Sequence, residues 1–320
     1  MRKYTRLRSL VRVMYDMQDI RLRTYARIMN EEYRNTLEKD DNGNIIAQKS
    51  TAEQAAERKA LIEQLTKEYK AIEKEVEGKR WKSIEKELVA RKSKIQSQIT
   101  WALIKQCVES ERQEKYLQSV IKSIVETIPI YSEHLVNERG CGPTIAAILI
   151  SEIDIDEARH VSSLWKYAGV DVVNGHGRSK RAEDLVEREY VDKNGDVKTK
   201  KGISYNPFLK TKLCGVFASC FIKAGGPYRE IYDQAKVRYK AAHPEYSVAH
   251  VNNMAKRYAV KMFLKNLWNK WRALEGYPPE PDYWEQYISG RSHGENAKKE
   301  EEDENVSLNI TEEDLLDMDL

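Results

Sequence analysis

The clearest chemical pattern in the sequence is a glycine-rich turn near its middle. The segment Arg139-Gly140-Cys141-Gly142-Pro143-Thr144 precedes a run of small and apolar residues that predicts a helix. Glycines permit a tight turn and a close backbone approach, and proline is tolerated at the first helical position. The free amides of that helix would face an anion. We therefore predict a helix-hairpin-helix element that binds the DNA backbone through Arg139, Gly140, Gly142, Pro143 and Thr144; the alternative is an ordinary packing corner between two helices.

A second group of candidates lies between residues 174 and 182. Ser179 has His176 and Lys180 as neighbours, so a serine nucleophile activated by a base is conceivable. The alternative is a loop that binds phosphate, in which Gly175 and Gly177 give access to the backbone. We favour this basic loop and keep Ser179 as a candidate nucleophile. The cations of the basic loop are Arg178, Lys180 and Arg181.

A third group combines lysines with aromatic residues. Tyr205 and Phe208 lie among five lysines: Lys198, Lys200, Lys201, Lys210 and Lys212. Aromatic rings among cations suit stacking on an unpaired base together with contact to the backbone. Packing of the rings beneath a solvated lysine surface is an equally favoured alternative. We carry four lysines forward as nucleic-acid-binding candidates: Lys200, Lys201, Lys210 and Lys212.

Other chemistries find no support in the sequence. The four cysteines form no CxxC pair, and no histidine lies near a cysteine pair at zinc spacing. We therefore expect reduced cysteines, no bound metal and no cofactor. The sequence also lacks a P-loop, a Rossmann fingerprint and an HExxH motif, so nucleotide-driven and zincin chemistry are unsupported.

The charge distribution favours a nucleic-acid partner. The chain of 320 residues carries a net charge of only +3. Residues 295–320 hold eleven acidic residues and two lysines, which leaves +12 on residues 1–294. A basic body suits phosphate neutralisation, although the acidic tail could serve solubility alone. No apolar run nears the ~20 residues that cross a bilayer, and the first residues lack the pattern of a signal peptide, so we expect neither a membrane nor a secreted protein.

Two amino-terminal segments precede the candidate residues. Residues 1–50 predict a basic amphipathic helix over 4–37 and an Asn-Gly turn; the helix could lie on DNA or anionic lipid or pack within the protein. Residues 51–128 contain no proline and one glycine, Gly78. Their apolar spacing predicts a long helical arm, a helical hairpin or coiled coil with a break at Gly78.

The remaining residues predict a helical domain over 129–290 and a disordered acidic tail over 291–320. Glu189 to Lys198 predicts a β-hairpin with Asn194-Gly195 as its two-residue turn. The expected fold class is thus mainly α, with a long helical hairpin or coiled coil followed by a domain containing a helix-hairpin-helix element and one β-hairpin. Its helices are predicted over 144–153, 161–168, 206–224, 227–242 and 247–275.

Several ordered stretches within residues 125–272 resemble one protein family. They are Gly140–Ile153, Ser163–Val170, Asn206–Leu213, Gly226–Asp233 and Arg257–Trp268. In this succession they are similar to the carboxy-terminal domain of the insertion-sequence transposase class that includes Piv-type DNA invertases and bridge-RNA-guided recombinases. The family also places a coiled coil ahead of this domain, which fits residues 52–127.

The sequence departs from the family at its catalytic parts. Family members carry an amino-terminal RNase H-like domain with four acidic metal ligands, and nothing in residues 1–50 resembles its strands. The family's catalytic serine lies in a Ser-Gly loop, and if Gly175 matches that glycine, Asn174 takes the place of the serine. The hairpin of residues 188–201 resembles an insertion.

Taken together, these patterns predict a transposase-like DNA-binding protein that acts in DNA transposition or site-specific recombination. We expect it in the cytoplasm of a prokaryotic or phage-infected cell, associated with the nucleoid. Expected partners are DNA or structured RNA, a second copy of the chain bound through the arm, and a catalytic subunit supplied in trans. Two alternatives stay open: a non-catalytic structural or regulatory DNA- or RNA-binding protein of phage or mobile-element origin, and a coiled-coil scaffold that binds no nucleic acid.

Overall fold

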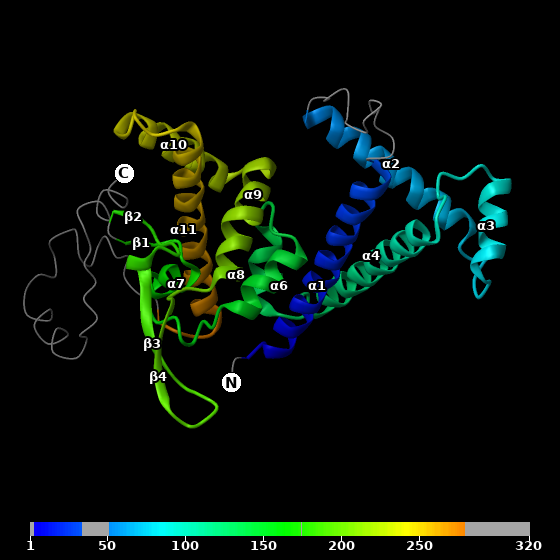
Figure 1. The fold of residues 1–320 in the computed structure, drawn as a ribbon. Helices are drawn as coiled ribbons and strands as arrows, with labels where there is room; N and C mark the ends of the chain where they lie inside the picture. The colour runs from blue at the N-terminus through cyan, green and yellow to red at the C-terminus, as the bar shows by residue number, and fades with distance from the viewer. Residues whose placement is uncertain (1–2, 34–50, 174, 279–320) are drawn as a thin grey trace, which may run out of the picture. The chain divides into compact units, whose positions relative to one another are not determined.

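The computed structural model describes residues 3–33, 51–173 and 175–278, which are mainly helical with two small antiparallel sheets (Figure 1). The predicted mainly α fold class is confirmed, and the described residues form two β-hairpins where one was predicted. The chain divides into a helical unit of residues 9–121 and a carboxy-terminal unit of residues 1–8 with residues 122–320. Three predicted features lie outside the described residues: the Asn-Gly turn near residue 43, Asn174 and the acidic tail.

The helical unit is built from segments that contain no proline. In chain order they are α1 (Thr5–Ile28), η1 (Met29–Tyr33), α2 (Thr51–Ile72), α3 (Trp81–Ala90) and α4 (Gln98–Val125). Gly78, at φ +74°, lies in the turn between α2 and α3, where the break was predicted. The loop between α3 and α4 is fixed by Glu68, whose carboxylate accepts hydrogen bonds from the Ser93 hydroxyl at 2.6 Å and the Lys94 amide at 2.8 Å.

Most of the apolar positions that predicted a coiled coil are buried within one chain, although Ile99 is 64% exposed. Tyr69 packs against Trp101 with ring centroids 4.6 Å apart, at the centre of a core to which all the helices of this unit contribute. The predicted two-helix arm is therefore a small bundle that includes the end of α1. Its buried residues include Ile28, Leu65, Ile72, Val76, Ile84, Leu88, Ile95 and Ile104.

The amphipathic helix α1 packs within the protein. Its apolar residues Leu7, Val11 and Met14 are buried. Two of its arginines pair with buried carboxylates, Arg8 with Glu152 and Arg21 with Glu114. Among the described residues, no helix combines the length and the apolar character needed to cross a bilayer.

The carboxy-terminal unit collects its helices around α11. In chain order they are α5 (Pro129–Glu133), η2 (Leu135–Asn137), α6 (Pro143–Glu152), α7 (Val161–Ala168), α8 (Pro207–Lys210), η4 (Thr211–Phe217), α9 (Ala218–Ala224), α10 (Pro227–Ala242) and α11 (Val248–Leu274). The segments α8, η4 and α9 follow one another without a break, and η4 is a π-helical stretch, which widens the turn at Cys214. Two tryptophans of α11, Trp268 and Trp271, are buried, and Phe217 and Tyr228 pack edge to face against Phe263.

Two β-hairpins lie between α7 and α8. The smaller pairs β1 (Val172–Val173) with β2 (His176–Gly177), and the larger pairs β3 (Leu185–Val191) with β4 (Val197–Ile203). The larger one confirms the predicted hairpin but extends further, and its predicted two-residue turn is wrong. The amide of Asp192 donates to the carbonyl of Asp196 at 2.9 Å, and Gly195 has φ +91°, so a three-residue turn ends in a left-handed glycine.

Candidate nucleic-acid interface

The glycine turn, residues 138–142, connects η2 to α6. Gly140 has φ +84°, and a Cβ built on it would lie 2.7 Å from the amide nitrogen of Phe221. It would lie 2.8 Å from the carbonyl carbon of Cys220 as well, so any side chain would collide with the backbone of α9. The close approach that we expected Gly140 to make to a phosphate is made to α9. Packing inside the protein therefore requires this glycine.

Gly142 lies at the open side of the same turn. It is exposed, and its carbonyl accepts the first hydrogen bond of α6 from the amide of Ala146 at 3.0 Å. Pro143 occupies the first helical position, as predicted, and the amides of Thr144 and Ile145 have no partner within the helix. The start of α6 therefore has the geometry that binds oxyanions at helix amino termini.

Arg139 lies across the turn that precedes α10. Its Cδ lies 3.1 Å from the position that a Cβ would take on Gly226, which has φ +103°. The glycine leaves room for the aliphatic stem of the arginine, and the residue as a whole is exposed. Arg139 is thus a surface cation beside the glycine turn, as its predicted role requires.

The basic loop, residues 175–181, is anchored by Arg178. Its guanidinium donates to the carboxylate of Asp171, at 2.8 Å from Nε and 2.6 Å from Nη2, and to the hydroxyl of Ser204 at 2.7 Å. The hydrogen bonds from this guanidinium to Asp171 raise the pKa of Arg178. Arg178 is only 8% exposed, so its charge holds the loop in place and does not face solvent as we had expected.

Ser179 lies in a hydrogen-bonded turn closed by Asp184. Its hydroxyl and its amide each donate to Asp184 at 2.8 Å, and the other neighbour of this carboxylate is His176 Nε2, at 3.1 Å. Burial acts to raise the pKa of Asp184, but the hydrogen bonds from Ser179 and His176 outweigh it and the pKa is lowered. A carboxylate with a lowered pKa is a weak base, and the ring of His176 is directed to this carboxylate. The arrangement explains Ser179 as a structural residue of the turn.

Three cations converge beside the basic loop, and we call Lys210, Lys256 and Arg257 the cation cluster. A Cβ on Gly177 would lie 1.8 Å from Nη1 of Arg257, so the absence of a side chain at Gly177 admits the guanidinium. All three cations act electrostatically on the thiol of Cys214, whose pKa is nevertheless raised by burial. Burial, with repulsion from neighbouring arginines, also lowers the pKa of Lys210.

The acidic groups near the cation cluster are committed to other partners. Asp171 pairs with Arg178, and Asp184 is held by Ser179 and His176. Lys210 donates to the backbone carbonyl of Arg178 and lies over the ring of Tyr205, with Nζ 4.7 Å from the ring centroid. Within the described part of the chain, no carboxylate forms an ion pair with a member of the cluster. Among the described residues, the cluster is therefore a site of positive charge without an ion-pair partner.

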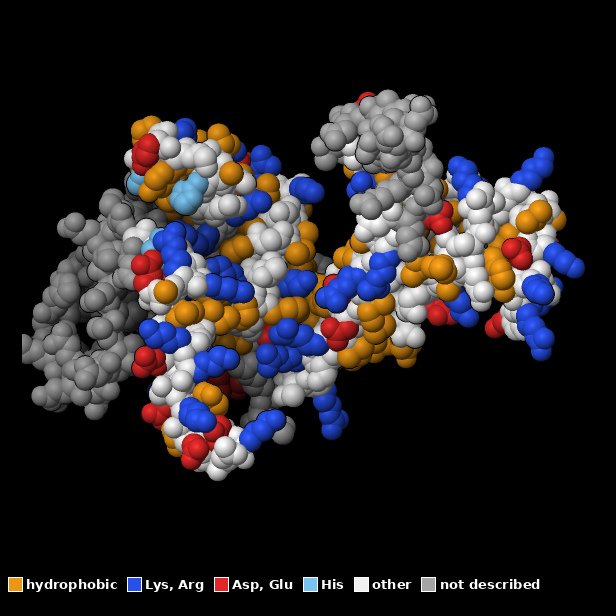
Figure 2. Space-filling model, viewed as in Figure 1, with side chains coloured by type: hydrophobic (Ala, Val, Ile, Leu, Met, Phe, Trp, Pro, Cys, Tyr) orange, Lys and Arg blue, Asp and Glu red, His pale blue; other side chains and the backbone are white. Residues whose placement is uncertain are grey.

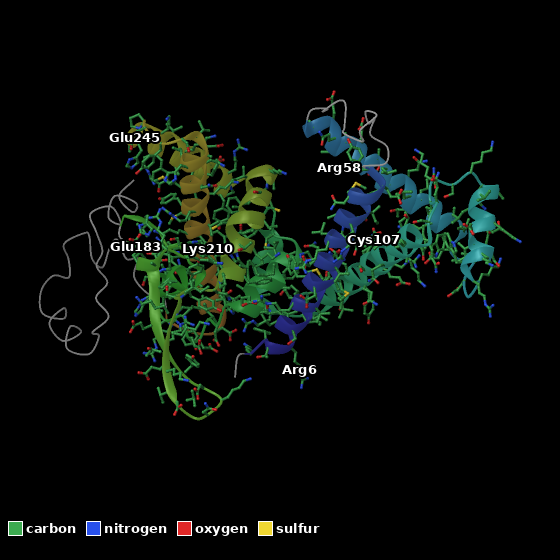
Figure 3. All side chains as sticks on the ribbon, viewed as in Figure 1. Arg6, Arg58, Cys107, Glu183, Lys210 and Glu245 are labelled. Atoms are coloured by element: carbon green, nitrogen blue, oxygen red, sulfur yellow. The ribbon has the colours of Figure 1, made fainter. Side chains whose placement is uncertain are left out.

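Figure 2 shows Lys and Arg side chains gathered on one face of the carboxy-terminal unit, where Figure 1 draws β1, β2 and α11. Figure 3 labels Lys210 and Glu183 on this face. Two cations of the basic loop, Lys180 and Arg181, are exposed, and Nη1 of Arg181 lies 3.6 Å from Oε1 of Glu183. The sequence reasoning missed Lys256 and Arg257, because nothing local distinguishes a basic pair within a long helix.

The lysines predicted as one group are divided by the fold. Lys210 belongs to the cation cluster, and Lys212 lies over the ring of Phe208 at 5.4 Å from the ring centroid. Lys200 and Lys201 lie on β4, on opposite faces of the larger hairpin. Tyr205 is buried, so stacking of a base on this ring is not available in the described structure.

His176, Glu183 and Asp184 bring three potential metal-ligand atoms within 4.8 Å of one another. These groups already contact each other or neighbouring cations: His176 contacts Asp184, and Glu183 lies near Arg181. Because the surrounding loop is basic, the arrangement is satisfied as an ion-pair network and gives no reason to place a metal there.

We compared the chain with protein-family models, with curated proteins and with solved structures. None of these comparisons finds a match. A function for this chain is therefore inferred from the chemistry of the carboxy-terminal unit and from the family resemblance of its sequence.

Proposed function

We propose that this chain binds DNA through the sugar–phosphate backbone and acts in DNA transposition or site-specific recombination. The observation that carries the binding is the cation cluster, whose three charges have no carboxylate partner among the described residues. The resemblance of residues 125–272 to insertion-sequence transposases supports the biological process.

The electrostatics of Lys210 favour an anionic ligand. Burial and repulsion from Arg257 and Arg178 both disfavour its charged form. An opposite charge within about 4–6 Å would favour that form again. A phosphate bound between Lys210 and Arg257 would supply this charge and relieve the repulsion. Arginine suits the role because its planar guanidinium can bind a phosphate with two parallel hydrogen bonds.

Two other parts of the unit support the same ligand. The amides of Thr144 and Ile145 at the start of α6 can donate to a backbone phosphate, next to the exposed Gly142. Lys180 and Arg181 add exposed charge on the basic loop. Contacts of this kind fix a protein on nucleic acid and carry little information about base sequence.

The geometry around Ser179 favours a binding role over catalysis by this serine. Its hydroxyl donates to Asp184 and accepts from the amide of Arg181 at 3.2 Å, so it is held as part of a turn. We therefore propose a DNA-binding component, with strand cleavage and joining supplied by a catalytic subunit in trans. The second candidate function is a structural or regulatory DNA-binding protein, which the same geometry fits.

A second copy of the chain remains a proposed partner. The apolar positions predicted to form a dimer seam, such as Leu65, Ile72 and Leu88, are buried within one chain. A dimer would therefore use other residues of the helical unit.

The cation cluster can be tested by the salt dependence of DNA binding. We expect the double variant Lys256→Ala, Arg257→Ala to lower affinity for a labelled duplex about tenfold or more at low salt. The slope of log K against log salt should fall by about 2, because each lost phosphate contact removes ~0.9. Binding would be followed by fluorescence anisotropy.

The matched control is Lys82→Ala, Lys86→Ala, which removes the same charge from exposed positions on α3. This control should bind almost as the unaltered protein does. The proposal would be contradicted if both double variants lost the same affinity for DNA. It would also be contradicted if binding by the unaltered protein did not depend on salt.

A further inference from the structure

The larger β-hairpin, formed by β3 and β4, has two faces of opposite character. The register pairs Val186 with Gly202, Arg188 with Lys200 and Tyr190 with Lys198, and these six residues form what we call the basic face. It holds three cations and no acidic residue. The opposite face holds two acidic residues and one lysine among its paired positions: Leu185, Glu187, Glu189, Val191, Val197, Thr199, Lys201 and Ile203.

Most of the hairpin is open to solvent on both faces. Residues 186–191 and 197–201 are exposed, with Tyr190 46% and Val197 67% exposed. Figure 1 shows β3 and β4 extending as a ribbon away from the helices of the carboxy-terminal unit. Packing inside this unit therefore does not account for the charge of the basic face.

Pairing within the hairpin does not account for it either. Arg188 and Lys200 are direct cross-strand partners, and like charges at such positions destabilise a sheet. Arg188 Nη2 donates to the carbonyl of Ile203 at 2.8 Å, and Lys198 pairs with Asp192 at the turn. Within the part of the chain that the structure describes, neither Arg188 nor Lys200 forms an ion pair with a carboxylate. An external anion would resolve this repulsion.

We propose that the basic face docks in the major groove of double-stranded DNA. A strand of seven residues is about 24 Å long at ~3.4 Å per residue, and two strands lie ~4.8 Å apart. The major groove is ~12 Å wide and ~8.5 Å deep and admits a two-stranded ribbon. Arg188 and Lys200 would contact phosphates or guanine edges, and Tyr190 would lie against the groove.

An RNA duplex suits this ribbon less well than DNA, because its wide minor groove is shallow and does not enclose two strands. The major groove of A-form RNA is deep and too narrow for side chains to read. The minor groove of DNA, at ~6 Å wide, is narrower than a ribbon with side chains. We therefore assign duplex DNA as the ligand, because the ribbon fits its major groove and the cations of the basic face complement its phosphates. The inference rests on the proposed function, because it names a further contact with the same nucleic acid.

The experiment compares two double variants with the same change in net charge. Arg188→Gln, Lys200→Gln alters the basic face; the control Lys193→Gln, Lys86→Gln alters the turn of the hairpin and a position on α3. All four positions are exposed, so folding should be preserved, which circular dichroism would check. The readouts are affinity for duplex DNA and protection of guanine N7, a major-groove atom, from methylation by dimethyl sulfate.

We expect the basic-face variant to lose about tenfold in affinity and to lose N7 protection, while the control variant retains both. The inference would be overturned if the two variants had the same affinity and the same N7 protection, or if protection persisted in the basic-face variant. Equally tight binding of an RNA duplex would overturn it as well. If the unaltered protein fails to bind DNA at low salt, the proposed function itself fails. If it binds and only the cation-cluster variant weakens binding, the hairpin inference alone is wrong.

Discussion

At the residue scale, two glycines of one turn have different physical reasons to be glycine. Gly140 has a positive φ, and a Cβ built on it would lie less than 3 Å from the backbone of α9, so both its conformation and its surroundings exclude a side chain. Gly142 has φ −75°, which any residue can adopt, and lies at the exposed start of α6. The first glycine is a packing requirement, and the second leaves the helix amides accessible.

We expect Gly140→Ala to lower the free energy of unfolding by about 2–4 kcal/mol, because it adds a strained φ and a collision with the backbone of α9. Gly142→Ala is the matched control and should cost less than about 1 kcal/mol. Urea denaturation followed by tryptophan fluorescence measures both. Equal stabilities would show that α9 can move away from the turn.

At the element scale, Asn206 starts the continuous helix α8–η4–α9 and connects it to the rest of the unit. Its side-chain oxygen accepts from the amides of Phe208 and Leu209, both at 3.1 Å. Its Nδ2 donates to the fully buried carboxylate of Glu152 at 2.7 Å and to Tyr167 Oη at 2.9 Å. One side chain thus caps a helix and satisfies a buried charge that Arg8 also pairs with.

Asn206→Ala should therefore lower the free energy of unfolding by about 3 kcal/mol, since it removes a helix cap and a hydrogen bond to a charged group. Asn253→Ala, at an exposed position on α11, should change it by less than about 0.5 kcal/mol. Asn206→Asp separates the two roles because it keeps the cap but places a second carboxylate against Glu152. If Asn206→Asp has the same free energy of unfolding as the unaltered protein, the helix cap alone accounts for the stabilisation by Asn206.

At the scale of the whole molecule, near-neutrality is a sum over segments of opposite charge. Residues 295–320 carry −9 and the preceding residues +12. The acidic segment follows the unit that carries the cation cluster, and a tethered segment acts at high effective concentration. It can therefore compete with DNA for that positive charge.

Truncation after Ser292 should tighten DNA binding several-fold at low salt, and the gain should shrink as salt is raised because screening weakens charge competition. Anisotropy titrations at several salt concentrations measure this. A full-length chain with the acidic residues of 295–320 replaced by Asn and Gln separates charge from length and should match the truncation. An affinity unchanged at every salt concentration would leave the tail with a role in solubility alone.

The sequence by itself determined the elements of this protein. The predicted helices of residues 161–168, 206–224 and 227–242 match α7, α8 to α9 and α10 within one residue, because proline, glycine and apolar periodicity act through local contacts. The break at Gly78 and the existence of the larger hairpin are local in the same sense. The sequence also pointed to Gly142 and Pro143 at the start of α6, where backbone geometry follows from a few neighbouring residues.

Only the tertiary structure decided which residues share a surface. Arg257 meets Gly177 across eighty residues of sequence, and no local pattern encodes that contact. The fold also buries Arg178 against Asp171. A buried guanidinium needs such a carboxylate partner, because removing an unpaired charge from water costs free energy. Lys200 and Lys201 are neighbours in sequence but lie on opposite faces of a strand, because side chains alternate and the register fixes which face each joins.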